Sequence, residues 1–137
     1  MKAINVSITV SSNVKKAWDV WNSPEHIKHW AFASDDWEVG EVAVDLRVGG
    51  SFQIEMRAKD GSEKFDFVGI YSIVDPLKQI FYSMPDGRKV EINFEAVSDD
   101  VTMVTEVFDM ENENSEELQR AGWQSILGNY KKYLESI

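Results

Sequence analysis

The chain has 137 residues, of which 43% are hydrophobic, and a formal net charge of -10. This length suits a single domain, residues 1–137, with a sizeable core. The absence of cysteine excludes disulfides, thiolate metal sites and a cysteine nucleophile, and favours a reducing compartment. The negative charge, without a Lys/Arg cluster, argues against nucleic acid and anionic membranes as partners. With no long apolar run or signal-peptide pattern, we expect a cytoplasmic protein.

The first elements are predicted by a change of hydrophobic period. Residues 4–10 alternate apolar and polar side chains, which indicates a half-buried strand. Val14, Ala17, Trp18 and Trp21 then follow at helical spacing, behind capping residues. A second short helix is expected from Ser23, because proline suits the position after the cap.

The middle of the chain is predicted to be an antiparallel meander. Apolar runs alternate with turn dipeptides such as Asp60-Gly61 and Asp86-Gly87. The six predicted strands cover residues 41–48, 51–58, 64–74, 79–84, 89–97 and 101–108.

The final segment is predicted to be a long amphipathic helix that begins at Ser115. At about 100° per residue, one face carries the set Gln119, Gly122, Trp123, Ile126, Tyr130, Tyr133, Leu134 and Ile137. Gly122 lies inside this helix, where glycine costs roughly 1 kcal/mol relative to alanine. We therefore predict that it lets the helix lie close to the sheet. The elements together predict an α+β fold, a seven-stranded curved antiparallel sheet with two short helices and one long C-terminal helix.

Seven short motifs carry a resemblance to a known family. They are "SDDW" (34–37), "DLRVGGSF" (45–52), "MRAKDGS" (56–62), "FDFVGIY" (65–71), "PDGRKV" (85–90), "VTEVFD" (104–109) and "LQRAGWQSIL" (118–127). In this order, over nearly the whole chain, they resemble the domain family homologous to the activator of heat-shock protein 90 ATPase. That family belongs to the START-like, or polyketide-cyclase (SRPBCC), superfamily. The resemblance implies a helix-grip fold, also called birch-pollen-allergen-like.

The resemblance also implies a site. The superfamily binds hydrophobic or amphipathic small molecules between the sheet and the long helix, and a minority of members are cyclases or hydrolases. Strand parity places the inward side chains of three strands opposite this helix if their more apolar faces point inward. We predict cavity walls at Phe52, Met56, Phe67, Tyr71, Tyr82, Trp123, Ile126 and Tyr130, with Trp30 and Trp37 at the mouth. The alternative is ordinary core packing of the same side chains.

Two polar residues are candidate ligand anchors. Glu106 shares its parity with Val104 and Phe108, so it faces inward if they do, and it would then need a basic partner such as Arg47 or Arg88, or a wet cavity. If the opposite parity is inward, Glu106 lies in solvent. Gln119 lies on the apolar helix face and could bind a ligand or a loop backbone.

Three functions remain open. The first is binding of a small hydrophobic or amphipathic ligand without catalysis. The second is a protein-interaction role, such as stimulation of the heat-shock protein 90 ATPase. The third is a cyclase or hydrolase that uses Glu106. No common hydrolase motif is present, and no cofactor is expected. His26 and His29, with Asp35 and Asp36 nearby, resemble a metal-ligand set only loosely, and no metal site is predicted.

Overall fold

The computed structural model describes residues 2–137, and within them seven strands form one antiparallel sheet. The strand order is β1-β7-β6-β5-β4-β3-β2, so β1 and β2 form its edges. The elements are β1 (Ala3–Val10), α1 (Val14–Asn22), α2 (Pro24–Ile27), β2 (Trp37–Val44), β3 (Ser51–Ala58), β4 (Lys64–Asp75), β5 (Gln79–Ser83), β6 (Lys89–Ser98), β7 (Val101–Asp109) and α3 (Glu116–Leu134). The predicted α+β helix-grip fold is confirmed.

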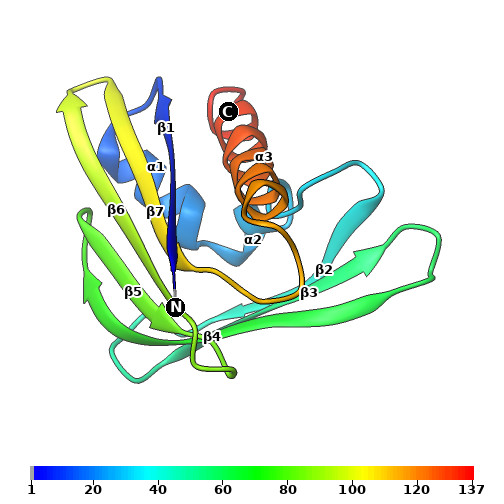
Figure 1. Ribbon diagram of the computed structural model, residues 1–137. Helices are drawn as coiled ribbons and strands as arrows, with labels where there is room; N and C mark the ends of the chain where they lie inside the picture. Colours follow the sequence, from blue (N-terminus) through cyan, green and yellow to red (C-terminus); the bar gives the residue numbers. More distant parts are fainter. Residues whose placement is uncertain (1) are drawn as a thin grey trace.

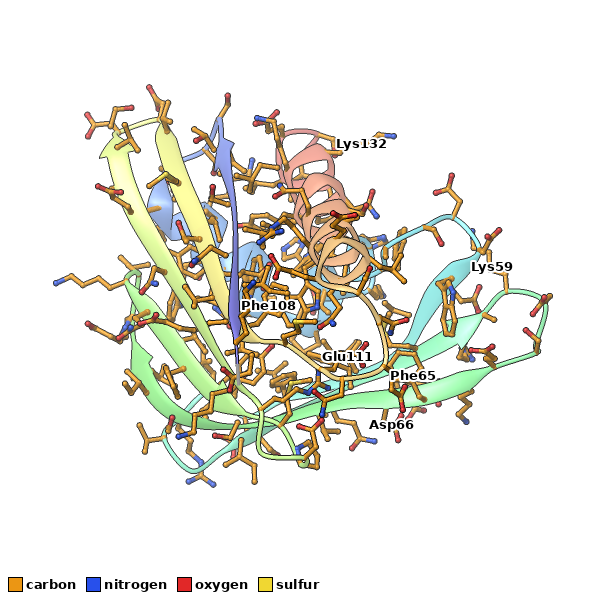
Figure 2. The ribbon with its side chains drawn as sticks, in the orientation of Figure 1. Lys59, Phe65, Asp66, Phe108, Glu111 and Lys132 are labelled. Carbon is orange, nitrogen blue, oxygen red and sulfur yellow. The ribbon has the colours of Figure 1, made fainter. Side chains whose placement is uncertain are left out.

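The sheet curves around α3, and α1 and α2 lie on the same concave side (Figure 1). Inward positions of the strands alternate with outward ones, as shown by the strictly alternating burial along β7. Figure 2 shows Phe108 of β7 directed into this interior, while Lys59 lies at the far end of the sheet. No helix in residues 2–137 is long and apolar enough to cross a membrane.

The long helix is fixed to the edge strand β1 by its polar side. Gln124 Nε2 donates to the Ser7 carbonyl at 3.0 Å, and Lys131 Nζ donates to the Thr9 carbonyl at 2.7 Å. These carbonyls belong to the edge strand, so the two side chains supply hydrogen bonds that a neighbouring strand would otherwise make. On the opposite side of α3, the Tyr130 hydroxyl donates to the Ala17 carbonyl of α1 at 2.6 Å.

The strand predicted over residues 41–48 is wrong in its position. The structure places β2 at Trp37–Val44, and the chain then turns. The Arg47 N–H donates to the Asp45 carbonyl at 2.9 Å, and the Gly50 N–H donates to the Arg47 carbonyl at 2.9 Å. The Arg47 Nε also contacts the Asp45 carboxylate at 2.9 Å. Apolar Leu46 and Val48 continue the strand alternation in sequence, and only these turn contacts end it.

The predicted inward face of α3 is partly confirmed. Gln119, Tyr130 and Leu134 are buried, whereas Ile137 lies beyond the helix and is 51% exposed. Leu127 was not predicted to face inward, yet it is fully buried. The contact face is therefore shifted around the helix toward Leu127.

The role predicted for Gly122 is wrong. A Cβ atom built on Gly122 would meet nothing within 4 Å, so no close approach to the sheet occurs there. The residue borders a surface recess that Trp123 and Leu118 also line. The glycine that allows close packing is Gly69, on the inner face of β4. A Cβ there would lie 2.4 Å from the Phe52 ring and 2.7 Å from the Tyr82 ring.

Alanine substitutions at the two glycines should have opposite effects. Gly122→Ala should raise the free energy of unfolding by up to about 1 kcal/mol, because it improves helix propensity without a clash. Gly69→Ala should lower it by about 1–3 kcal/mol, because two buried rings must move. Urea denaturation of both variants measures this. Gly128→Ala, in α3 with equally open surroundings, is the control for Gly122→Ala. A loss of stability in Gly122→Ala alone would restore a packing role for that glycine.

Candidate functional site

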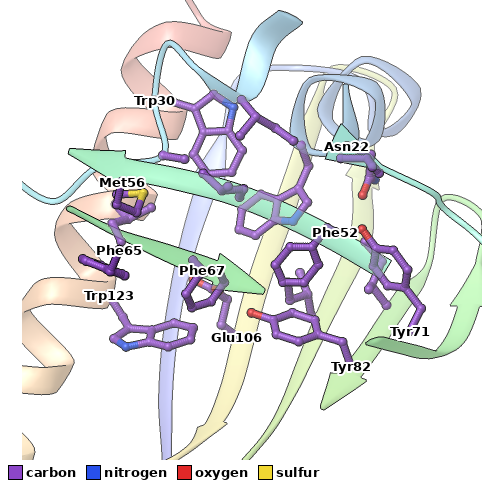
Figure 3. A pocket seen from close by; sticks show the side chains of 18 residues that line it. Asn22, Trp30, Phe52, Met56, Phe65, Phe67, Tyr71, Tyr82, Glu106 and Trp123 are labelled. Carbon is purple, nitrogen blue, oxygen red and sulfur yellow. The ribbon is translucent and has the colours of Figure 1, made fainter. Parts of the chain in front are cut away.

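A cavity of about 200 Å³ lies between the curved sheet and the helices (Figure 3). Helices α1 and α3, the region of α2, and strands β2 to β7 each contribute to its wall. The lining residues are Trp21, Asn22, Ile27, Trp30, Ala31, Val44, Phe52, Ile54, Met56, Phe65, Phe67, Tyr71, Ile80, Tyr82, Ile92, Glu106, Trp123 and Ile126. The concave side of the sheet is therefore not completely filled by side chains.

The structure brings most of the predicted site residues together around this cavity. Those on its wall are Trp30, Phe52, Met56, Phe67, Tyr71, Tyr82, Glu106, Trp123 and Ile126. The strand members all have the inward parity that the sequence predicts. In Figure 3, Trp30, Phe52, Phe67 and Trp123 surround a central space, and the Tyr82 hydroxyl points toward it.

Trp37 and Tyr130 do not line the cavity. Trp37 packs edge-on against Phe65 with 5.6 Å between the ring centroids, so it supports a wall residue from outside. Tyr130 is fully buried behind Trp21 and Trp30, whose ring centroids lie 4.9 Å and 5.0 Å from its own. Both residues position cavity side chains without contacting the cavity.

Gln119 does not line the cavity either. Its side chain accepts a hydrogen bond from the Glu111 N–H at 2.9 Å and donates to the Asn114 carbonyl at 2.8 Å. Figure 2 shows Glu111 on the connection between β7 and α3. Of the two roles open for Gln119, these contacts support the one in which it binds a loop backbone.

Sequence reasoning did not select half of the lining residues. Ile54, Phe65 and Ile80 could have been selected, because they share the inward parity of Phe52, Phe67 and Tyr82. By contrast, no local pattern identifies the members contributed by α1 and the region of α2. These are Trp21, Asn22, Ile27 and Ala31.

The aromatic walls contact one another in a continuous set. The Phe52 ring meets the Tyr82 ring at 4.7 Å in an edge-to-face arrangement. Trp123 lies flat on Phe108, with centroids 3.9 Å apart and an angle of 8° between planes. The Phe67 ring also neighbours Trp123: their ring centroids lie 6.4 Å apart, with an angle of 72° between the ring planes. These packed rings give the cavity rigid, apolar walls.

Exposure along the wall distinguishes a deep end from an outer end. Ile80 and Ile92 are 1% and 2% exposed, whereas Phe65 is 51% exposed. Figure 2 places Phe65 and its neighbour Asp66 on the outlying part of β4. The cavity is therefore most open to solvent beside Phe65.

Glu106 is the ionisable carboxyl of the cavity, and it is 4% exposed. Its partners across the sheet are Val6 on β1 and Ile92 on β6, both apolar and buried. The basic partner predicted for it is not found: Arg47 contacts Asp45, and Arg88 contacts Asp86 at 2.7 Å. Burial without an offsetting hydrogen bond or positive charge raises the pKa of Glu106 from its ordinary 4.5 to about 8.

The pKa values of the two tyrosines on the cavity wall are also shifted. Burial raises the pKa of the Tyr82 hydroxyl well above its ordinary value, and the negative charge of Glu106 adds to the effect. Burial raises the pKa of Tyr71 as well. At neutral pH the ionisable groups on the cavity wall are thus predominantly uncharged, and all of them carry oxygen atoms.

The histidines belong to a separate cluster around Tyr133. His26 Nδ1 lies 2.7 Å from the Tyr133 hydroxyl, and the His29 ring stacks on the Tyr133 ring at 5.1 Å. In residues 2–137 no group of three or more His, Asp or Glu side chains is arranged to hold a metal ion.

The shifted carboxyl predicts a dependence of stability on pH. Between pH 4.5 and about 8 the folded chain keeps a proton on Glu106 that the unfolded chain has released. The free energy of unfolding should therefore fall as pH rises through this window, by up to about 1.4 kcal/mol per unit. Glu106→Gln should remove this contribution, so its stability advantage over the wild type should grow from pH 6 to 8 and then level off.

Urea denaturation at pH 6, 7, 8 and 9 measures this difference. Glu95→Gln is the matched control, because Glu95 is an exposed carboxylate on the neighbouring strand β6. It should follow the wild type at each pH. A constant difference between Glu106→Gln and wild type would mean that Glu106 titrates normally.

Comparisons with known proteins agree with the fold. The NMR structure of the AHSA1-like protein from Aeromonas hydrophila shares 39% identity with a TM-score of 0.87, over 97% of this chain and 93% of that one. A protein from Cytophaga hutchinsonii shares 45% identity with a TM-score of 0.84, over 97% and 92%. A Nitrosomonas europaea protein, at 21% identity, shares the fold with a TM-score of 0.84 over 98% and 94%.

A search of curated proteins gives no significant match. The family model described as "Activator of Hsp90 ATPase homolog 1-like protein" matches residues 11–135. This match covers nearly all of the elements that build the cavity, from α1 to α3. The chain therefore belongs to the family of activator of Hsp90 ATPase homolog 1-like proteins.

Proposed function

We propose that the chain binds a small hydrophobic or amphipathic molecule in the cavity between the sheet and α3. The observation that carries this proposal is the unfilled space of about 200 Å³ with predominantly apolar and aromatic walls. An apolar cavity of about 150 Å³ accommodates one benzene molecule. The expected ligand therefore has about one or two rings, or a short alkyl chain.

The cost of an empty cavity supports a role for it. Protein interiors are normally close-packed, and empty apolar volume costs roughly 24 cal/mol per Å³. A space of about 200 Å³ that side chains leave unfilled therefore lowers stability relative to a filled core. Gly69 shapes this wall by letting Phe52 and Tyr82 pack against β4, since even one methyl group there would displace both rings.

The tryptophans provide a direct test of binding. Trp21, Trp30 and Trp123 line the cavity, whereas Trp18 and Trp37 do not. In a two-dimensional ¹H–¹⁵N spectrum, 2-phenylethanol should shift the indole signals of the first three saturably and leave the other two nearly unchanged. Shifts of Trp18 and Trp37 alone, or of no indole at all, would contradict binding in this cavity.

A filled cavity should lose this response. Ala31 lies on the wall and is 8% exposed, so Ala31→Leu adds three carbons to the space and should weaken 2-phenylethanol binding at least tenfold. The control is Ala43→Leu, at an exposed position of β2, which should bind like the wild type. Equal binding by both variants would place the ligand elsewhere.

The family description supports a second candidate, stimulation of the Hsp90 ATPase. A steady-state ATPase assay of Hsp90 with and without the chain tests it. Stimulation that persists in Ala31→Leu would assign this activity to the surface instead of the cavity. No stimulation at saturating chain concentration would remove the candidate.

A further inference from the structure

We propose that the ligand of the cavity is a small organic cation, a protonated amine on an apolar ring or short chain, whose ammonium group pairs with Glu106. This inference rests on the proposed ligand-binding function and specifies the chemical class of the ligand.

The first observation is the unpartnered carboxyl itself. Glu106 is 4% exposed and lines the cavity, and its pKa is shifted by burial alone, without a hydrogen bond or a charge. No lysine, arginine or histidine occurs among the lining residues. A buried carboxyl can be charged at low cost only when it has a positive partner, and within the cavity a cationic ligand would supply one.

Tyr71 of β4 and Tyr82 of β5 are the titratable groups that share the cavity wall with Glu106. Arg88 is close enough to Tyr82 for its charge to oppose the rise in the Tyr82 pKa, but it pairs with Asp86 at 2.7 Å and does not line the cavity. Strands β1 and β6 present Val6 and Ile92 beside Glu106. The remaining wall members from α1, the α2 region, β2, β3 and α3 are the aromatic or aliphatic side chains given above and the amide of Asn22. Among the described residues, no positively charged side chain lies on the cavity wall to pair with the Glu106 carboxylate.

The second observation is the hydrogen-bonding character of the wall. Asn22 Nδ2 already donates to the Trp18 carbonyl at 3.0 Å, and Trp30 Nε1 donates to the Val20 carbonyl at 3.2 Å. The carboxyl oxygens of Glu106 and the hydroxyl oxygen of Tyr82, which is close enough for the Glu106 charge to act on its pKa, remain as acceptors. An ammonium group has three donors and no acceptor, so it matches these oxygens, whereas an anionic ligand would find no positive group to pair with.

The third observation is the aromatic wall. Ring faces attract cations within about 6 Å, and the interaction reaches about 2 kcal/mol where water is excluded. Tryptophan gives the strongest interaction of this kind, and three tryptophans line the cavity. The net charge of -10 also raises the local concentration of cations around the chain. A neutral ligand of equal size would gain neither effect.

The protonation of Glu106 and of the amine should make the binding affinity depend on pH. Alone, Glu106 holds its proton up to about pH 8. When an ammonium ion binds below that pH, the carboxyl O–H bond breaks, the proton passes to solvent, and the carboxylate pairs with the intact ammonium group. Affinity should therefore rise with pH up to about 8, and fall above about pH 10, where the amine itself loses its charge.

The experiment compares 2-phenylethylamine with its neutral counterpart 2-phenylethanol by isothermal titration calorimetry from pH 6 to 9. Amine affinity should rise roughly tenfold per pH unit below pH 8, while alcohol affinity should not rise. At pH 7, titrations in two buffers of different ionisation enthalpy should show release of nearly one proton per amine and none per alcohol.

Two variants complete the test. Glu106→Gln keeps the size and neutrality of the protonated side chain, so it should fold. At pH 8 its affinity for the amine relative to its own affinity for the alcohol should fall at least tenfold, and the pH dependence of amine binding should disappear. Glu95→Gln, which removes an exposed charge from β6, should behave like the wild type.

The outcomes separate the two proposals. If the alcohol binds in the cavity and the amine does not, or if amine affinity is the same at every pH or unchanged in Glu106→Gln, the inference about cations is overturned and the binding function stands. If neither probe binds, both are overturned.

Discussion

The stacking of Trp123 on Phe108, at 3.9 Å and 8°, determines which part of the interior is filled. It holds α3 against β7, while Gln124 and Lys131 fix the same helix along the edge strand β1. The helix is straight and the sheet is curved, so the two surfaces separate toward β4, β3 and β2 (Figure 1). The cavity occupies that separation. Its position therefore follows from the side of the sheet on which the helix is held.

The uncharged state of Glu106 follows from the same geometry. A carboxylate in an apolar interior is expensive unless it is paired, and Arg47 and Arg88 pair with Asp45 and Asp86 instead of with Glu106. The group consequently keeps its proton at neutral pH. An acid in this state can donate a hydrogen bond, or can ionise when a positive group arrives. The helix and sheet thus enclose a carboxyl that is uncharged at neutral pH.

The sequence predicted the sheet, half of the residues on the cavity wall and the inward orientation of Glu106 as one of two alternatives, because strand alternation is a local property. It could not predict the contribution of Ile27 and Ala31, since the placement of α2 and the chain after it depends on tertiary packing. Helical periodicity identified the face that carries Ile126 and Tyr130, but not which of them meets the cavity. The error at Gly122 has the same origin. Whether a glycine is crowded depends on side chains from other strands, as Phe52 and Tyr82 show at Gly69.

Glu95 and Glu106 show how strongly environment controls one side chain. They lie on the paired strands β6 and β7, but Glu95 is exposed and Glu106 is buried. In water, opposite charges about 4 Å apart attract by about 1 kcal/mol, and at an effective dielectric constant near 20 by about 4 kcal/mol. Dissolved salt weakens the attraction between a positive charge and an exposed carboxylate such as Glu95 far more than the attraction to a buried carboxylate. The burial that keeps Glu106 neutral is therefore also the condition under which a nearby positive charge would act on it most strongly.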